Sequence, residues 1–207
     1  HPLILGTFQN RMEKMNFIVD LVVTRHLTTF THSVMVSYLA EAIGKHILAA
    51  RPELLRIPSS YLEGNVYASP AEVLDYIVPA ALFHDIGKNG MIPIINTQHR
   101  KLNDYEFNII QTHPQKGSDY LSSDPDFLIY QPVALGHHRS YDGTRGYPLS
   151  FDNTASPYRD AIDLIHICDC LDAATDYLSR NYHRAKPFDV VLNELKAGRG
   201  TEYNPDM

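Results

Sequence analysis

The sequence predicts an all-α fold, a single helical bundle of about six to seven helices with one long loop. Apolar residues recur three and four positions apart through most of the chain, and the alternation typical of strands is rare. Breaks that contain proline or glycine separate these periodic segments. The chain has 207 residues, 44% of them hydrophobic and 20% charged, which is typical of a globular domain with a substantial core. We therefore expect one domain over residues 1–207.

Four segments have the spacing of buried helix faces. They are Phe17 to Ile43, Val73 to Phe83, Tyr105 to Ile110 and Ala161 to Leu171. The second has a clear beginning, because Ser69 can cap a helix that starts with Pro70 and carries Glu72 in its first turn. We expect this helix to run to His84-Asp85 and to be closed by Gly87.

The longest stretch without helical periodicity is Ser140 to Pro157, which is rich in Gly, Asp, Ser, Pro and Tyr. A loop of this length in a compact domain is usually functional or disordered. Because it directly follows His137-His138, and because binding residues are common on loops held by a rigid scaffold, we favour a functional loop over a mobile one.

Charge and hydropathy narrow the classes of partner. The chain has 18 Lys+Arg and 24 Asp+Glu, a formal net charge of −6, so neither a long nucleic acid nor an anionic membrane surface is favoured. No apolar run approaches the ~20 residues needed to cross a bilayer, so we expect no membrane insertion in this segment.

The cysteines and the first residues bear on location. Cys168 and Cys170 are too close in sequence for a comfortable disulfide, and we interpret them as small buried apolar residues in a reducing cytoplasm. The chain begins with His1-Pro2 instead of Met, so we expect a fragment of a longer signalling protein whose sensory or receiver domain lies outside this segment.

Histidine is abundant, with 11 residues, and several lie at the ends of segments that we predict to be helices. The most informative run is His84-Asp85-Ile86-Gly87-Lys88, which places an imidazole next to a carboxylate, with an amine one turn later. Imidazole and carboxylate ligands suit iron, manganese or zinc. The further candidates are His32, His113, His137, His138 and Asp169.

Taken singly, each candidate is weak, because a lone helical histidine is more often a hydrogen-bonded core or surface residue. We place His26, His46, His99, His166 and His183, together with Asp172 and Asp176, in that class. Asp169 lies in an apolar run, where a buried carboxylate costs several kcal/mol unless a cation or hydrogen bonds neutralise it; a solvent-facing Asp169 remains the alternative. Adjacent residues such as His137-His138 share one ion only at a helix end, which Gly136 and the following loop can provide.

In this order the motifs resemble the HD superfamily of metal-dependent phosphohydrolases, and more closely its HD-GYP subgroup. Residues 84–88 match the HDIGK signature, and His137-His138, Tyr141-Asp142-Gly143 and Gly146-Tyr147-Pro148 match the HHxxxDGxGYP segment. The similarity covers roughly His32 to Pro205. It implies an all-helical domain that binds two or three transition-metal ions, usually iron or manganese, and typically hydrolyses cyclic di-GMP.

The resemblance also implies roles for individual residues. One ion would be held by His32, His84, Asp85 and Asp169, and a second by Asp85, His113, His137 and His138. Asp85 would bridge the two ions, and a hydroxide between them would be the nucleophile. Lys88 would hold a phosphate oxygen. The remaining expected substrate-binding residues are Arg145, Tyr147, Arg180 and Arg184.

The sequence also departs from the family pattern. Thr28 stands where members with three metals carry Glu, so we expect two ions and no third. The loop has an extra residue around Thr144-Arg145, and Asp163 stands where the family often has Arg. The metal ligands are thus complete, while the substrate rim is altered.

Three functions remain in competition. The first and favoured one is a phosphodiesterase acting on cyclic di-GMP or a related cyclic dinucleotide. The second is an HD-type phosphomonoesterase or nucleotidase, and the third a non-catalytic module that binds a cyclic dinucleotide. The sequence leaves open the metal, the oligomeric state, a homodimer included, and the upstream signal.

Overall fold

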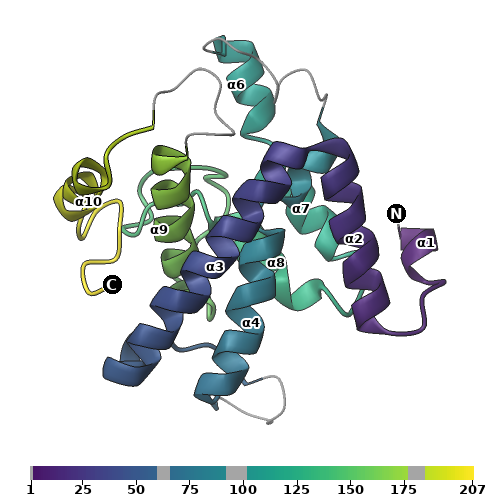
Figure 1. The fold of residues 1–207 in the computed structure, drawn as a ribbon, viewed down its shortest axis with the longest axis horizontal. Coiled ribbons are helices and arrows are strands. Elements are labelled where there is room, and N and C mark those ends of the chain that lie inside the picture. Colours follow the sequence, from purple (N-terminus) through teal and green to yellow (C-terminus); the bar gives the residue numbers. More distant parts are fainter. Residues whose placement is uncertain (1, 60–65, 92–101, 177–184) are drawn as a thin grey trace.

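The computed structural model describes residues 2–59, 66–91, 102–176 and 185–207, and these form an all-helical bundle, which confirms the predicted fold class (Figure 1). Seven of its α-helices have seven residues or more: α2 (Arg11–Arg25), α3 (Leu27–Ala50), α4 (Pro70–Phe83), α6 (Asp104–Ile110), α7 (His113–Leu121), α9 (Arg159–Thr175) and α10 (Phe188–Ala197). The shorter ones are α1 (Pro2–Leu5) and α8 (Gln131–Gly136), and 3-10 helices span Pro52–Leu54, Ile86–Gly90 and Leu128–Tyr130. Within the described ranges β-pairing is limited to isolated bridges.

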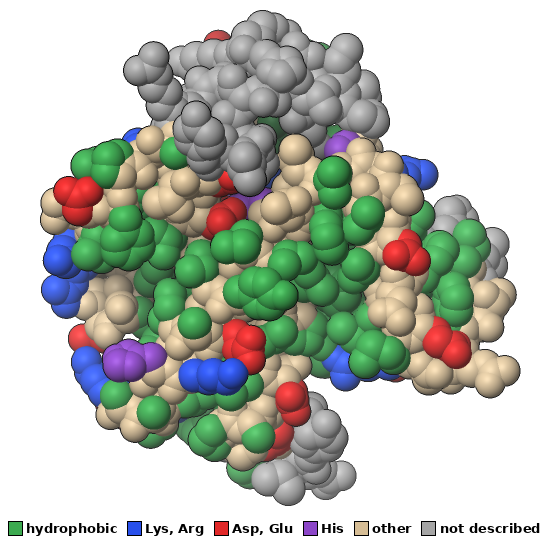
Figure 2. Space-filling model, viewed as in Figure 1, with side chains coloured by type: hydrophobic (Ala, Val, Ile, Leu, Met, Phe, Trp, Pro, Cys, Tyr) green, Lys and Arg blue, Asp and Glu red, His purple; other side chains and the backbone are tan. Residues whose placement is uncertain are grey.

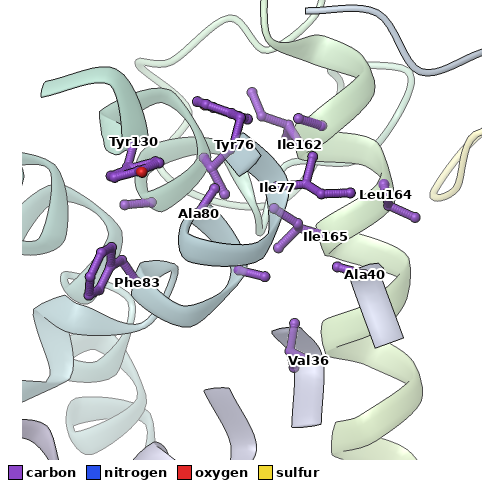
Figure 3. Close-up of a cluster of buried hydrophobic side chains, with 14 of the residues drawn as sticks. Val36, Ala40, Tyr76, Ile77, Ala80, Phe83, Tyr130, Ile162, Leu164 and Ile165 are labelled. Atoms are coloured by element: carbon purple, nitrogen blue, oxygen red, sulfur yellow. The ribbon is translucent and has the colours of Figure 1, made fainter. Parts of the chain in front are cut away.

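The centre of the bundle is the packing of α3 against α4 and α9 (Figure 1). Figure 3 shows apolar side chains from these helices pointing toward one another, among them Val36 and Ala40 from α3 and Ile77 from α4. Gly44 lets α3 and α4 approach closely, because a Cβ there would lie 2.5 Å from Cδ1 of Ile77. This core fixes the three helices that carry His32, His84 and Asp169.

The segment from Phe17 to Ile43 is two helices rather than one. His26 has φ −146° and ψ 73°, which ends α2 and lets α3 begin at the next residue. Its N–H still donates to the carbonyl of Val22, and its own carbonyl accepts from the N–H of Phe30. The apolar spacing continues through this break because His26 is itself buried, so periodicity could not reveal it.

Helix α4 begins as predicted but ends earlier. Ser69 and Glu72 form a reciprocal capping box at its start. The α-helix ends at Phe83, and Gly87 lies inside the next 3-10 helix instead of closing α4. The reason for glycine at this position is packing, because a Cβ on Gly87 would lie only 1.9 Å from the backbone oxygen of His113.

Two further regions bear on the periodicity prediction. Helix α10 was not predicted, although Phe188, Val191, Leu192 and Leu195 have the three- and four-residue spacing of a helix face; of these, only Val191 is fully buried. The long loop between α8 and α9 is confirmed as non-helical over Ser140 to Pro157. It is nevertheless tied to the rest of the protein, because the N–H of Tyr141 donates to the carbonyl of Glu202 at 2.9 Å and Nε of Arg139 donates to the carbonyl of Phe151 at 3.1 Å.

The outer surface mixes apolar and polar side chains. Figure 2 shows hydrophobic side chains spread across the middle of one face. On α3, Met35 and Tyr38 are exposed. Within the described ranges, no helix has both the length and the apolar character needed to cross a membrane.

Candidate metal centre

Asp85 lies in the middle of the buried polar side chains, directly after α4. Its Oδ1 is 3.1 Å from Nε2 of His113 and 3.7 Å from Nε2 of His137. Its Oδ2 is 3.5 Å from Nε2 of His84 and 3.8 Å from Nε2 of His32. Each carboxylate oxygen therefore faces a different pair of imidazoles, which is the arrangement that a carboxylate shared between two ions requires.

The surrounding side chains form two buried groups, and within each group the candidate ligand atoms lie within 4.8 Å of one another. The first contains Asp85, His113, His137 and His138, and the second contains His32, His84 and Asp169. The residues that do not follow α4 come from the second turn of α3, the start of α7, the end of α8 and the middle of α9. Imidazole and carboxylate donors suit first-row transition metals, so the two clusters are consistent with a binuclear metal site.

The backbone holds three of the histidines in one tautomer. In His84, His113 and His137, Nδ1 lies 2.6, 2.7 and 2.9 Å from the carbonyl oxygen of the residue three positions earlier. A carbonyl only accepts, so Nδ1 carries the proton and Nε2 keeps its lone pair. These are the Nε2 atoms that lie close to Asp85. A metal-ligating histidine is commonly oriented in this way.

His32 is held by two carboxylates of α9. Its Nε2 is 3.0 Å from Oδ1 of Asp169, and its Nδ1 is 2.6 Å from Oδ2 of Asp172. Burial disfavours the charged imidazolium, but the hydrogen bonds to the two carboxylates outweigh it and raise the pKa of His32 to about 9. Asp172 thus orients a candidate ligand, a role that the sequence interpretation missed although Asp172 follows Asp169 by three residues on one helix face.

The other buried groups have pKa values suited to a cation. Burial lowers the pKa of His84, His113 and His137, so they are neutral at pH 7. Burial opposes ionisation of Asp85, but the positive charge of Lys88 beside it holds its pKa well below the usual range. An anionic carboxylate among neutral imidazoles is the protonation state in which these side chains bind metal.

Two buried atoms, one from each cluster, indicate whether metal ions would fit the site. In the part of the chain that the structure describes, Nε2 of His84 and Oδ1 of Asp85 are buried without a hydrogen-bond partner. Buried polar atoms are nearly always paired, and leaving one unpaired costs ~1–3 kcal/mol. Both atoms are acceptors, so cations coordinated by them would remove this cost. The residues present therefore fit the metal ions that the sequence implies.

Lys88 connects the buried cluster with its surroundings. Its ammonium contacts Oδ2 of Asp85, and its side chain is partly exposed. Lys88 is therefore a partly exposed cation that is held beside the buried carboxylate.

The other expected substrate residues lie in different settings. The ring of Tyr147 lies 4.6 Å from that of His138 and 6.1 Å from that of His113, measured between centroids. Arg145 is exposed and lies 3.4 Å from the carboxylate of Glu202. Arg180 and Arg184 lie outside the described residues.

Two further side chains support the centre and were missed. His166 was assigned to the unremarkable histidines, yet its Nδ1 lies 2.6 Å from the carbonyl oxygen of His137 and its Nε2 lies 3.4 Å from Glu202. Arg139 is buried and binds backbone carbonyls of the following loop. Position was the only available signal, since His166 precedes Asp169 by one helical turn and Arg139 follows His138.

Asp163, expected at the substrate rim, is 4% exposed. Its Oδ2 accepts from the side-chain amide of Asn204 at 3.0 Å and lies 3.7 Å from Nε of Arg159. It therefore joins α9 to the C-terminal segment. Burial is the main influence on this carboxyl and raises its pKa from 3.8 to about 6.

We expect this shift to appear as a pH-dependent stability difference between the parent protein and Asp163→Asn. As pH rises from about 4 to about 6, the unfolded chain ionises Asp163 before the folded protein does, so the parent protein loses stability. The free energy of unfolding of the parent protein should fall by about 3 kcal/mol relative to that of the variant, which is the energy equivalent of the pKa difference. Urea unfolding of both proteins at matched metal content measures it. Parallel stability profiles over this range would contradict the assignment.

The HD domain family model matches residues 29–181. A cyclic di-GMP phosphodiesterase of Vibrio cholerae is 26% identical over 197 residues, covering 90% of this chain and 39% of that protein. The cyclic di-GMP phosphodiesterase response regulator RpfG of Xanthomonas campestris pv. campestris is 32% identical over 136 residues, covering 65% of this chain and 35% of the relative. The chain thus spans less than two fifths of either relative's length.

Among solved structures, the chain is similar in fold to the HD domain of the L. monocytogenes phosphodiesterase PgpH in complex with cyclic-di-AMP. The TM-score is 0.52 at 18% sequence identity, and the alignment covers 91% of this chain and 85% of that chain. At this identity the likeness concerns the fold alone.

Proposed function

The chain belongs to the HD-domain family, and from that premise we propose that it hydrolyses a phosphodiester bond in cyclic di-GMP or a related cyclic dinucleotide. The observation that carries the proposal is Asp85, whose two oxygens face separate imidazole pairs. A carboxylate with two such faces suits a binuclear centre, and paired metals suit in-line displacement at phosphorus.

We assign the ligands as two sets that share Asp85. His32, His84, Asp85 and Asp169 would hold one ion, and Asp85, His113, His137 and His138 the other. Iron and manganese are the metals that we favour. Bound there, the ions would supply an activated water and neutralise charge on the phosphate.

The protein's own groups would orient the substrate. Lys88 would exchange its contact with Asp85 for a non-bridging phosphate oxygen, which brings the phosphate to the side of the centre where Oδ2 lies. Asp172 would keep His32 in place through Nδ1. The ring of Tyr147, beside His138, would limit access of water from the loop side.

Support for a diester rather than a monoester substrate comes from the relatives. The two curated proteins described above are named cyclic di-GMP phosphodiesterases. The metal-loaded protein should therefore be given cyclic di-GMP, cyclic di-AMP, a mixed cyclic GMP-AMP and a nucleoside monophosphate in parallel. Cleavage of a cyclic dinucleotide supports the proposal. Release of phosphate from the monoester alone would favour the phosphomonoesterase alternative.

Lys88→Ala should retain its metal ions but hydrolyse the substrate poorly. Lys88 supplies a charge for phosphate and is not among the proposed ligands, so kcat/KM should fall about a hundredfold, the scale of losing one donor to a developing charge. Steady-state kinetics and elemental analysis of one preparation measure both quantities. Lys116→Ala, at an exposed position of α7, is the control and should behave like the parent protein. Full activity in Lys88→Ala would refute the role.

A further inference from the structure

Arg139 is a buried cation immediately after His138. The residue is 4% exposed, and no carboxylate among the described residues forms an ion pair with it. Its guanidinium instead donates to main-chain carbonyls. Nε donates to the oxygen of Phe151 at 3.1 Å, Nη1 to that of Arg145 at 2.6 Å, and Nη2 to that of Gly143. A planar fork of donors is suited to holding several acceptors in fixed positions.

These carbonyls belong to the loop that follows the metal centre, so Arg139 sets the shape of that loop. Gly146 lies against the backbone of His138, where a Cβ would be 1.9 Å from the His138 oxygen, and it has a φ of +85°. The N–H of Tyr147 donates to the same oxygen at 3.2 Å. The loop is thus folded directly onto a proposed metal ligand.

The consequence of this loop shape is the position of one aromatic ring. The Tyr147 ring lies beside the imidazole of His138 and presents an edge-on contact to that of His113. An aromatic ring at the edge of the centre can pack against a nucleobase, a contact that tolerates different bases. The described hydrogen bonds of the Arg139 guanidinium go to loop carbonyls and not to a proposed metal ligand.

We propose that Arg139 is a positioning residue for substrate, which fixes Tyr147 against the metal centre so that the ring packs on one base of a cyclic dinucleotide. The substrate part of this inference rests on the proposed function. Arg139 acts through Tyr147, so loss of the fork should weaken substrate binding without removing metal. A lysine in its place keeps the charge but has no planar fork to hold separate carbonyls.

The position of the ring can be tested without any activity. The chain contains no tryptophan, so Tyr147→Trp introduces one tryptophan, which can be excited selectively over the tyrosines. Adding Arg139→Lys should shift its emission to the red and increase quenching by acrylamide, because the reporter leaves the His138 ring for solvent. The matched control is Arg199→Lys, which also removes a guanidinium that donates to a loop carbonyl, that of Pro205. Identical emission and quenching with and without Arg139→Lys would overturn the proposal.

Kinetics of the metal-loaded chain test the functional part. Arg139→Lys should raise KM for the cyclic dinucleotide about tenfold, the scale of losing a hydrogen bond from a charged donor, while kcat and metal content stay close to those of Arg199→Lys. Tyr147→Ala should raise KM similarly, and it leaves Arg139 and its carbonyl partners unchanged. Unaltered KM in Tyr147→Ala, or metal loss in a folded Arg139→Lys, would overturn the proposal.

The two proposals fail in different ways. If the parent protein cleaves no cyclic dinucleotide, the proposed function fails, and the inference about substrate fails with it. The fluorescence comparison would still decide whether Arg139 positions residue 147. If the parent protein is active and the Arg139 and Tyr147 variants both keep the KM of the parent protein, the inference alone fails.

Discussion

Asp85→Ala should lose both metal ions and, with them, hydrolysis of the cyclic dinucleotide. Asp85 approaches two imidazoles of each cluster, through Oδ1 on one side and Oδ2 on the other. Asp169 approaches only one of each among the described residues, His32 at 3.0 Å and His138 at 3.7 Å. Without it, each ion would keep only its remaining ligands and lose the charge that offsets the cations. Activity should fall by about a thousandfold or more, as when a residue of a cooperating catalytic group is removed. Elemental analysis and turnover of the same preparation measure the two effects.

A matched variant separates this effect from general destabilisation. Asp124 is also a buried aspartate, and it pairs with Lys14 at 3.0 Å, away from the metal centre. Asp124→Ala should be less stable than the parent protein yet retain both ions. If Asp85→Ala kept two ions per chain, Asp85 would not be the shared ligand.

Gly87→Ala should be strongly destabilised and should bind metal poorly. The added Cβ would lie 1.9 Å from the oxygen of His113 and 2.6 Å from the nitrogen of Gly117, both backbone atoms that have no side-chain freedom to move away. The 3-10 helix would have to move off α7, which separates Asp85 from His113. We expect a loss of about 3 kcal/mol in unfolding free energy, at the upper end for overpacking. Urea unfolding and metal titration measure it.

The control lies in the same 3-10 helix. A Cβ on Gly90 would meet only the flexible end of Lys116, at 3.8 Å. Gly90→Ala should therefore stay within about 0.5 kcal/mol of the parent protein, as for a typical surface substitution. Equal stability of the two variants would show that α7 does not constrain position 87.

The sequence predicted the helical class and the start of α4 because both depend on local patterns. Apolar spacing and the Ser69–Glu72 pair act within a few residues, so the chain itself displays them. The break at His26 was hidden, because a buried residue continued the apolar spacing across it. Helix α10 was not hidden in this way, because Phe188, Val191, Leu192 and Leu195 have helical spacing; the segment was missed although its pattern is local.

For the candidate centre too, only the residues with a recognisable sequence pattern could be predicted. Ligand-type residues in a recognisable order identified the candidates that the structure brings together, whereas Asp172, His166 and Arg139 carry no such pattern. Their contacts depend on which helix face or loop carbonyl is packed beside them, and that is decided by tertiary structure. His166 and Asp172 each lie about one helical turn from Asp169 in the sequence, but this spacing alone did not distinguish them from ordinary helical residues.

The most direct test of the central claim is to count metal ions and measure turnover of cyclic di-GMP in one anaerobically purified sample. Thr28, one turn before His32, offers no carboxylate for a third ion, so we predict about two ions of iron or manganese per chain. The protein should also cleave the cyclic dinucleotide. This cleavage should stop when the ions are removed and return when they are restored. A protein that holds both ions and binds cyclic di-GMP yet leaves every cyclic dinucleotide intact would contradict this claim.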